Sequence, residues 1–404
     1  MKLLIFCGDL LWILQKNGYR MYKVCREEKD SKMEKIKEMF KKDPILYISG
    51  ILAVISLFIV KPDKEYAGYI NFRVIAILFS LMLIVGALTR IGTFDYLTSR
   101  LLRKMDSEKK LSLFLCVLAF FMSMLLTNDV TLVTLVPFAI MVLSAFNDSR
   151  RLMYTLILMT IAANLGSMLT PIGNPQNLYL YTEYGFSLGN FLLMMLPYTG
   201  VAFLLIVATV LWLNRTDKTA DSVEMHEVPA PKPVKLIIYI ALFILSILTV
   251  AGFVHYLIML AVVTLTMLVT DKKAFKNVDY ALLLTFCFFF VLIGNLGRID
   301  IIYETLTAVV SKNVTLTAVL ASQVISNVPA AILLSAFTDN GAALVIGTNL
   351  GGLGTLIASM ASLITFKFYG NLKEEQKKGG NYLLSFTALN VIFLTVFMVM
   401  TVVI

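Results

Sequence analysis

Two short polar interruptions within long apolar segments are the residues of this sequence best suited to bind an ion. The interruptions are Thr127-Asn128-Asp129 and Ser326-Asn327-Val328, the second followed by Pro329. An asparagine amide can coordinate a cation through its oxygen and can donate a hydrogen bond to an anion through its nitrogen. Asn128 and Asn327 are therefore the leading candidate ligands. The alternative for each is an asparagine that only joins two helices.

Asp129 is the only carboxylate deep within an apolar stretch. Burying a charge there is costly enough that the group should be paired, metal-bound or protonated. We interpret Asp129 as a proton-coupling or cation-coupling residue. A structural carboxylate that accepts hydrogen bonds from freed backbone N–H groups is the alternative.

Two further apolar segments are interrupted by glycine, proline and polar residues. They contain NLGSMLTPIGNPQN at 164–177 and NLGGLGTLIAS at 349–359. A continuous helix is improbable through such residues, so each break leaves backbone groups that need partners. Carbonyl oxygens suit a dehydrated Na⁺, and helix N-termini suit an anion. Asn174 and Ser359, with Thr127 and Ser326, are secondary donors, for which helix packing is an equal alternative.

The elements that would position these residues are membrane spans. The chain has 404 residues, of which 58% are hydrophobic and 15% charged, and apolar runs of about 15–25 residues alternate with short charged loops. We predict an all-α polytopic membrane protein with about nine transmembrane helices and two re-entrant hairpins. The net charge of +9 could indicate nucleic acid binding, but the basic residues flank apolar runs, which favours a role in membrane orientation.

The predicted organisation has two halves. A charged, cytoplasmic or interfacial N-terminal segment (1–43) precedes a first half (44–213), a cytoplasmic linker (214–235) and a second half (236–404). The first half contains a re-entrant hairpin at 111–144 and a broken helix at 152–180, and the second half repeats these at 314–338 and 342–366. The distribution of Lys and Arg predicts a cytoplasmic N-terminus and an extracytoplasmic C-terminus in the cell (inner) membrane.

An internal repeat supports this division. GALTRI at 86–91 aligns with GNLGRI at 294–299, and the two NLG segments align with Thr and Ile in register. The loop charges give the two halves opposite orientations. Inverted repeats with broken helices are typical of secondary transporters, whose substrate site lies where the breaks meet. Chance recurrence of short glycine words is the alternative.

These motifs resemble those of the ion transporter superfamily, which includes divalent-anion/sodium symporters, citrate-metal transporters, arsenite permeases and a branch of sodium/proton antiporters. The likeness spans roughly 44–404. The two polar tips resemble the family's Ser-Asn-Thr tips, and Gly173-Asn174-Pro175-Gln176-Asn177 resembles its Gly-Ser/Thr-Pro-Pro-Asn element. The resemblance implies a scaffold domain, an elevator-like transport domain and a homodimer.

The resemblance also implies the binding residues. One Na⁺ site would use Asn128 and Gly173, a second would use Asn327 and Ala358, and Asp129 would contribute to cation binding or coupling. The substrate would contact the two tips with Asn174 and Ser359, a set comprising Thr127, Asn128, Asp129, Asn174, Ser326, Asn327, Val328 and Ser359.

Departures from the family pattern narrow the class of substrate that we expect. Both third-position threonines of the tips are replaced, by Asp129 and Val328, and the second Pro-Pro-Asn is absent. Because an acid beside the substrate repels dicarboxylates, the chain resembles the arsenite-permease and anion-permease branches more than succinate carriers. The same departures leave H⁺ beside Na⁺ as the expected coupling ion.

The sequence therefore predicts a secondary active transporter of a small carboxylate or oxyanion, coupled to Na⁺ or H⁺ and using no cofactor. A cation/proton antiporter is the alternative. An intramembrane enzyme is disfavoured because the only histidines are His226, in a loop, and His255, at the edge of a span. A channel is disfavoured because nothing resembles a selectivity ring.

Overall fold

The computed structural model describes residues 44–102, 107–144, 146–213 and 229–403, and the regular structure of these residues is entirely helical. The charged segment 1–43 and positions 214–228 of the predicted linker lie outside the described residues. Apolar side chains from most of the helices form the buried core.

Nine helices lie in the described part of residues 44–213. They are α2 (Pro44–Ile59), α3 (Tyr66–Tyr69), α4 (Phe72–Arg90), α5 (Thr93–Leu102), α6 (Glu108–Leu125), α7 (Asn128–Ser144), α8 (Ser149–Ser167), α9 (Pro175–Glu183) and α10 (Leu188–Leu213). The chain breaks between α6 and α7 at the predicted polar triplet. The interrupted segment predicted at 152–180 is somewhat longer, because α8 begins at Ser149 and α9 ends at Glu183.

The second half contains the corresponding breaks. Its elements are α11 (Pro233–Val250), α12 (Tyr256–Thr270), η1 (Lys272–Asn277), α13 (Tyr280–Leu296), α14 (Asp300–Val310), α15 (Val314–Ile325), α16 (Asn327–Ser335), α17 (Gly341–Leu350), η2 (Leu356–Ala358), α18 (Met360–Gly370), η3 (Glu374–Lys377) and α19 (Tyr382–Val403). Only Ser326 separates α15 from α16. It has a φ of 73°, a backbone conformation that costs a residue other than glycine on the order of 1–3 kcal/mol.

Two short helices, α5 and α14, lie in segments for which the apolar pattern predicts no spanning element. Each carries its apolar residues on one face. The axes of α13 and α14 differ by 105°. At that bend Arg298 donates a hydrogen bond to Asp63 at 2.6 Å, which holds the pKa of the exposed Asp63 carboxyl below its usual range.

Several helices are long and apolar enough to cross a membrane. In the described part of the chain four segments meet both criteria, and the count rises to five if α13 and α14 form one bent span. The four are α4, α10, α11 and Glu374–Val403. Shorter apolar helices accompany them, among them α2, α7, α12, α15 and α17. The fold is that of a multi-pass membrane protein, while the predicted number of nine spans remains a prediction.

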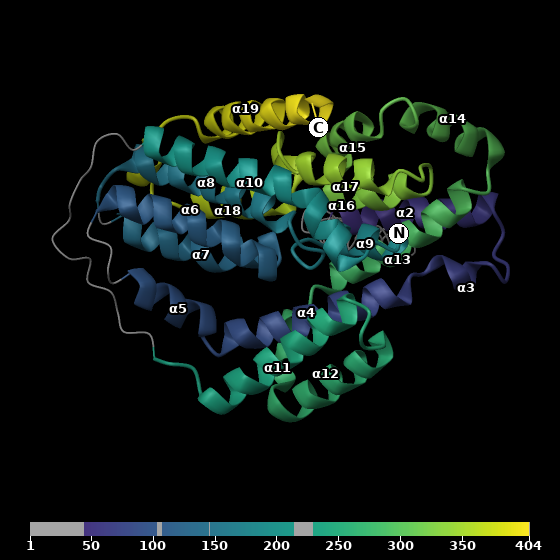
Figure 1. The fold of residues 1–404 in the computed structure, drawn as a ribbon, viewed down its shortest axis with the longest axis horizontal. Helices are drawn as coiled ribbons and strands as arrows, with labels where there is room; N and C mark the ends of the chain where they lie inside the picture. Colours follow the sequence, from purple (N-terminus) through teal and green to yellow (C-terminus); the bar gives the residue numbers. More distant parts are fainter. Residues whose placement is uncertain (1–43, 103–106, 145, 214–228, 404) are drawn as a thin grey trace, which may run out of the picture.

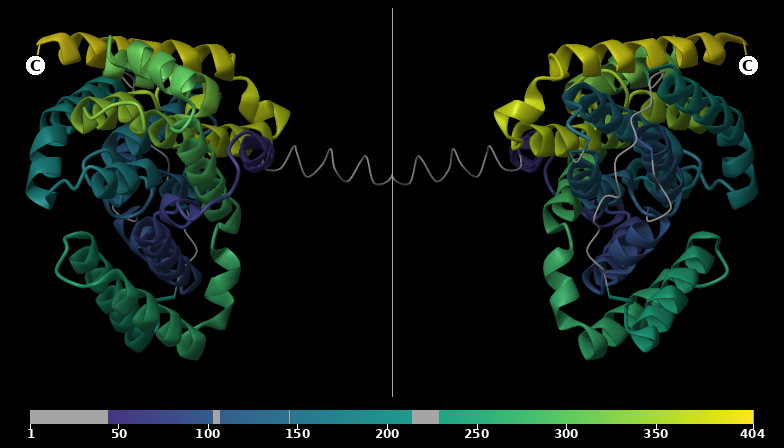
Figure 2. Two further views of the ribbon diagram at one scale, coloured as in Figure 1. Left: turned by 90° about the vertical axis from the view of Figure 1, so that its right-hand side faces the viewer. Right: turned by 90° about the vertical axis from the view of Figure 1, so that its left-hand side faces the viewer.

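The helices pack in two groups. In the first, α2 packs against α13 and α4 packs against α11 and α12, which lie along one edge of the molecule (Figure 1). In the second, α6, α7, α8, α10 and α18 pack together and continue into α9 and α15–α17. The last helix, α19, lies along the edge opposite α11 and α12 (Figure 2). Both chain breaks described above belong to the second group.

Two glycines allow close contact between helices of the second group. A Cβ on Gly166 of α8 would lie 2.1 Å from the carbonyl oxygen of Phe120 in α6. A Cβ on Gly351, at the end of α17, would lie 2.5 Å from the hydroxyl of Ser322 in α15. At these two glycines α8 packs against α6, and the end of α17 packs against α15, with no room for a side chain.

Candidate functional site

Four helix N-termini meet at one small pocket of about 10 Å³. Its lining includes the first residues of the four helices α7, α9, α16 and α18, namely Asn128, Pro175, Asn327 and Met360. The residues preceding α9, α16 and α18 make no side-chain hydrogen bond to the helix start. At α7 the first N–H groups are already paired, with oxygens of Gly173, Asn128 and Thr127. Because all four N-termini carry a partial positive charge, and those of α9, α16 and α18 have no side-chain cap, the pocket is suited to an anionic group.

Asn164 joins the two halves of the site. Its Oδ1 accepts hydrogen bonds from Nδ2 of Asn128 at 2.8 Å and from the hydroxyl of Ser359 at 3.0 Å. Its Nδ2 donates to the carbonyl oxygen of Gly352 at 3.4 Å. One buried side chain at the end of α8 thus contacts the first polar tip and two residues of the second interrupted helix.

The predicted partners for a first cation, Asn128 and Gly173, are adjacent. The backbone N–H of Asn128 donates to the carbonyl oxygen of Gly173 at 3.3 Å. A Cβ on Gly173 would lie 2.1 Å from the carbonyl oxygen of Ser167, so this tight turn requires glycine.

The second predicted pair, Asn327 and Ala358, is linked through Ser326. The Ser326 hydroxyl donates to the carbonyl oxygen of Ala358 at 3.3 Å and lies 3.5 Å from Oδ1 of Asn327. Backbone carbonyl and asparagine oxygens are therefore neighbours at both breaks. These are ligand types that Na⁺ accepts.

Several buried polar atoms at the site have no hydrogen-bond partner among the described residues. They are Oδ1 of Asp129, Oδ1 of Asn174 and both side-chain polar atoms of Gln176. The other end of the Asn174 side chain donates to the hydroxyl of Ser167 at 2.5 Å. Since buried polar groups are normally satisfied, these atoms are candidate contacts for a ligand.

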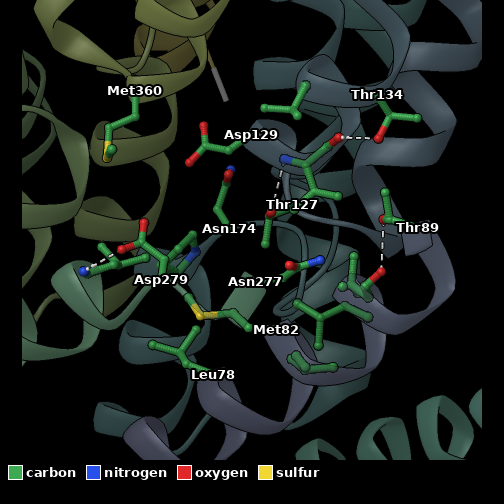
Figure 3. A pocket seen from close by; sticks show the side chains of 18 of the residues that line it. Leu78, Met82, Thr89, Thr127, Asp129, Thr134, Asn174, Asn277, Asp279 and Met360 are labelled. Atoms are coloured by element: carbon green, nitrogen blue, oxygen red, sulfur yellow. Dashed lines mark hydrogen bonds between the residues drawn. The ribbon is translucent and has the colours of Figure 1, made fainter. Parts of the chain in front are cut away.

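A larger cavity of about 460 Å³ adjoins the small pocket and shares Asp129, Asn174 and Met360 with it. Figure 3 shows Asp129 and Asn174 close together, with Asp279 on another wall of this cavity. Asp279 precedes α13 and its Oδ1 accepts from the N–H of Leu282 at 2.9 Å. Two carboxylates and no Lys or Arg are among the residues that line the cavity.

The predicted site residues fall into three sets. Six of them line the small pocket: Asn128, Asp129, Asn174, Asn327, Val328 and Ser359. Thr127 lines the larger cavity, and its hydroxyl accepts from the N–H of Val130 at 3.4 Å. Ser326, Gly173 and Ala358 line neither space. The Gly173 carbonyl oxygen accepts from the N–H of Asn128, and the Ala358 carbonyl oxygen accepts from the Ser326 hydroxyl.

Sequence reasoning did not single out Asn164, Gln176 and Asp279. The repeat alignment could have indicated Asn164, because it pairs with Asn349 in the two NLG words. The Asn349 side chain also crosses between the halves, donating to Oδ1 of Asn177 at 2.6 Å. Asp279 stands at the boundary of an apolar run, where a carboxylate is ordinary, and only the fold places it at the cavity.

Comparisons with known proteins agree with this architecture. The sequence model of the citrate transporter family matches residues 33–343. The chain is 34% identical over 333 residues to an uncharacterized transporter of Methanocaldococcus jannaschii, covering 81% of this chain and 90% of that protein. It is 31% identical over 318 residues to the inner membrane protein YbiR of Escherichia coli, covering 78% of this chain and 84% of that protein.

A shorter match links the chain to the silicon efflux transporter LSI3 of Oryza sativa subsp. japonica. It is 34% identical over 148 residues, covering 37% of this chain and 30% of that protein. The family and these named relatives are described as transporters or membrane proteins, and none as an enzyme. Together with its multi-pass helical fold, the match over most of its length shows that the chain belongs to the citrate transporter family of membrane transporters.

Proposed function

We propose that this protein is a secondary active transporter of a small anion, a carboxylate or an oxyanion, coupled to Na⁺ or H⁺. The observation that carries this proposal is the convergence of four helix N-termini on one pocket. The family description names citrate, which is a carboxylate, and agrees with that chemistry.

The balance of charge at the pocket favours an anion. Each helix N-terminus is equivalent to about half an elementary charge, so four supply roughly two positive charges. Asp129, when ionised, supplies one negative charge. The helix N-termini that face the pocket therefore offset the charge of Asp129, and their field is little screened because most of the lining is buried.

The two spaces differ in what they can hold. A pocket of about 10 Å³ accommodates one water-sized group, whereas the adjoining cavity of about 460 Å³ is of the size that holds small ligands. We infer that one anionic group of the substrate reaches the helix N-termini. The rest of the substrate occupies the cavity.

The coupling ion would bind at the breaks. Gly173 and Ala358 carbonyl oxygens with Asn128 and Asn327 supply oxygen ligands for Na⁺. Asp129 offers an alternative route, in which a proton neutralises the carboxylate before the anion enters.

We further propose that the two halves are inverted repeats with re-entrant hairpins, and that α6–α9 with α15–α18 move as one transport domain. Support comes from the matching close contacts of Gly166 and Gly351 and from the reciprocal contacts of Asn164 and Asn349. We also propose an elevator motion and a homodimer, which rest on the resemblance to the ion transporter superfamily. A cytoplasmic N-terminus is proposed from the charges of the loops.

A cation/proton antiporter is the second candidate. The observation that favours it is the presence of Asp129 and Asp279 at a cavity that no Lys or Arg lines. In that case Asp129 itself would exchange Na⁺ for H⁺.

Transport in proteoliposomes distinguishes the two functions. Purified protein would be tested with a panel of radiolabelled carboxylates and oxyanions, and in parallel for dissipation of a proton gradient by Na⁺ alone. Uptake of an anion driven by Na⁺ or H⁺ supports the carrier. A response to Na⁺ without any anion supports the antiporter and contradicts the carrier.

The site assignment is tested in the same assay. We expect Asn327→Ala to abolish uptake, while Asn190→Ala, on the exposed surface of α10, retains it. Wild-type uptake by Asn327→Ala would show that the pocket is not the transport site.

A further inference from the structure

A second cavity, of about 280 Å³, lies at the opposite ends of two helices that line the first. Asn71 at the start of α4 and Gly294 near the end of α13 line the second cavity. Thr89 near the end of α4 and Asp279 at the start of α13 line the first. The two cavities therefore approach the helices from opposite ends.

The internal repeat relates the two linings. Aligning Gly86 with Gly294 also pairs Asn277 with Tyr69 and Asp279 with Asn71, and in each pair the first residue lines the first cavity and the second residue lines the second. The same register pairs Met82 with Phe290 and Val85 with Ile293, again one in each cavity. Five residues of the second cavity therefore have a counterpart in the first: Tyr69, Asn71, Phe290, Ile293 and Gly294. Gly68, which also lies just before α4, has none.

The two cavities differ in how closely their opposite walls approach each other. A Cβ on Gly294 would lie 2.5 Å from the ring of Tyr69, whereas a Cβ on Gly86 would lie 3.1 Å from Asn277. The equivalent contact is thus tighter at the second cavity.

Tyr179 and Phe290 form an aromatic contact in the lining of the second cavity. Tyr179 of α9 is 4% exposed, its hydroxyl lies 2.7 Å from that of Ser335, and its ring centroid lies 5.5 Å from that of Phe290. The small pocket shares residues with the first cavity and none with the second.

We propose that the second cavity is the entrance to the same pocket from the other side of the membrane, held closed here by the packing of Tyr179 against Phe290 of α13. The two entrances exchange roles because the repeat gives each the same set of wall positions. This inference rests on the proposed transport function and adds to it the residues that form the far entrance.

The lining of the second cavity sets its charge. Glu183 is its carboxylate, and no Lys or Arg is among its lining residues. A cationic reagent should therefore reach this entrance faster than an anionic reagent of the same size.

The test uses single cysteines and membrane-impermeant methanethiosulfonate reagents, with the wild-type protein and its four cysteines as background. Ala336→Cys reports on the second cavity and Thr134→Cys on the first. We expect labelling of the two from opposite sides in intact cells and inverted vesicles. At Ala336→Cys we expect the cationic reagent to react several-fold faster than the anionic one, with Glu183→Gln removing the difference.

The double variant Thr134→Cys/Ala336→Cys tests whether opening of one entrance closes the other. A bulky maleimide on Thr134→Cys fills the first cavity and should prevent its closure, so labelling at Ala336→Cys should slow at least five-fold. Asp339→Cys, an exposed position outside both cavities, serves as the control and should label at an unchanged rate.

Labelling of Ala336→Cys and Thr134→Cys from one side, or unlinked rates, would overturn the inference. These measurements need no substrate. Uptake that remains intact with unlinked labelling contradicts this inference alone, whereas linked labelling without any uptake contradicts the proposed function alone.

Discussion

Asn164 illustrates how one side chain can connect two half-sites. Its oxygen accepts from Asn128 and Ser359 together. Removing it leaves two buried donors without that acceptor, at about 1–3 kcal/mol each. We expect Asn164→Ala to reduce the rate of substrate uptake by at least ten-fold, measured in proteoliposomes at saturating coupling ion.

The matched control is Asn390→Ala. Asn390 is also a fully buried asparagine, but its amide donates to the Phe386 carbonyl within α19. Equal losses of uptake in the two variants would mean that Asn164 acts only through folding.

Asp129 is the residue whose charge would oppose the proposed anionic substrate. A carboxylate about 5 Å from a bound anion contributes repulsion on the order of 1–3 kcal/mol at an effective dielectric constant of about 20 or more. We expect Asp129→Asn to lower the KM for the anion several-fold and to flatten the pH dependence of uptake. The measurement is initial uptake rate against substrate concentration at several pH values.

Asp279→Asn provides the comparison, because Asp279 is exposed at the cavity. Its effect on KM should be smaller and should disappear in high salt, where exposed charges are screened. Identical pH profiles for wild type and Asp129→Asn would contradict the role given to Asp129.

At the scale of the helices, close packing beside the breaks requires glycine. We expect Gly166→Ala to lower the thermal denaturation temperature in detergent, since its Cβ would meet the Phe120 carbonyl at 2.1 Å and overpacking costs about 1–3 kcal/mol. Gly189→Ala is the control, because no atom lies within 4 Å of its added Cβ. A denaturation temperature unchanged by Gly166→Ala would show that α8 can move away from α6 without loss.

The same scale shows what a sequence can and cannot predict. Polar residues inside an apolar run, as at Asn128 and Asn327, predict a break in the helix, because lipid offers no partner for them. The breaks occur there. The short helices α5 and α14 escaped prediction because their half-apolar faces lack the length of a span.

Contacts between segments that are far apart in the sequence could not be predicted from the local pattern of apolar and polar residues. The Asn128–Asn164 hydrogen bond and the position of Asp279 at the cavity depend on how helices cross, which no single periodicity specifies. Of the six predicted residues that line the small pocket, four belong to the motifs at the two tips, and Asn174 and Ser359 belong to the two interrupted segments.

At the scale of the whole molecule, the thermal stability of the protein can identify the proposed coupling ion. An ion that binds only the folded transporter stabilises it by about 2.7 kcal/mol at a concentration 100 times its Kd. If Na⁺ binds at the two breaks, replacing choline with Na⁺ at constant ionic strength should raise the denaturation temperature by a few degrees in wild type. The double variant Asn128→Ala/Asn327→Ala should show no such rise, whereas Asn190→Ala should respond as wild type does.

If H⁺ is the coupling ion, Na⁺ will have no effect on the denaturation temperature of any of these proteins, and uptake will instead follow an imposed pH gradient. A rise of equal size in the double variant would place Na⁺ elsewhere in the protein and would remove the two breaks as cation sites.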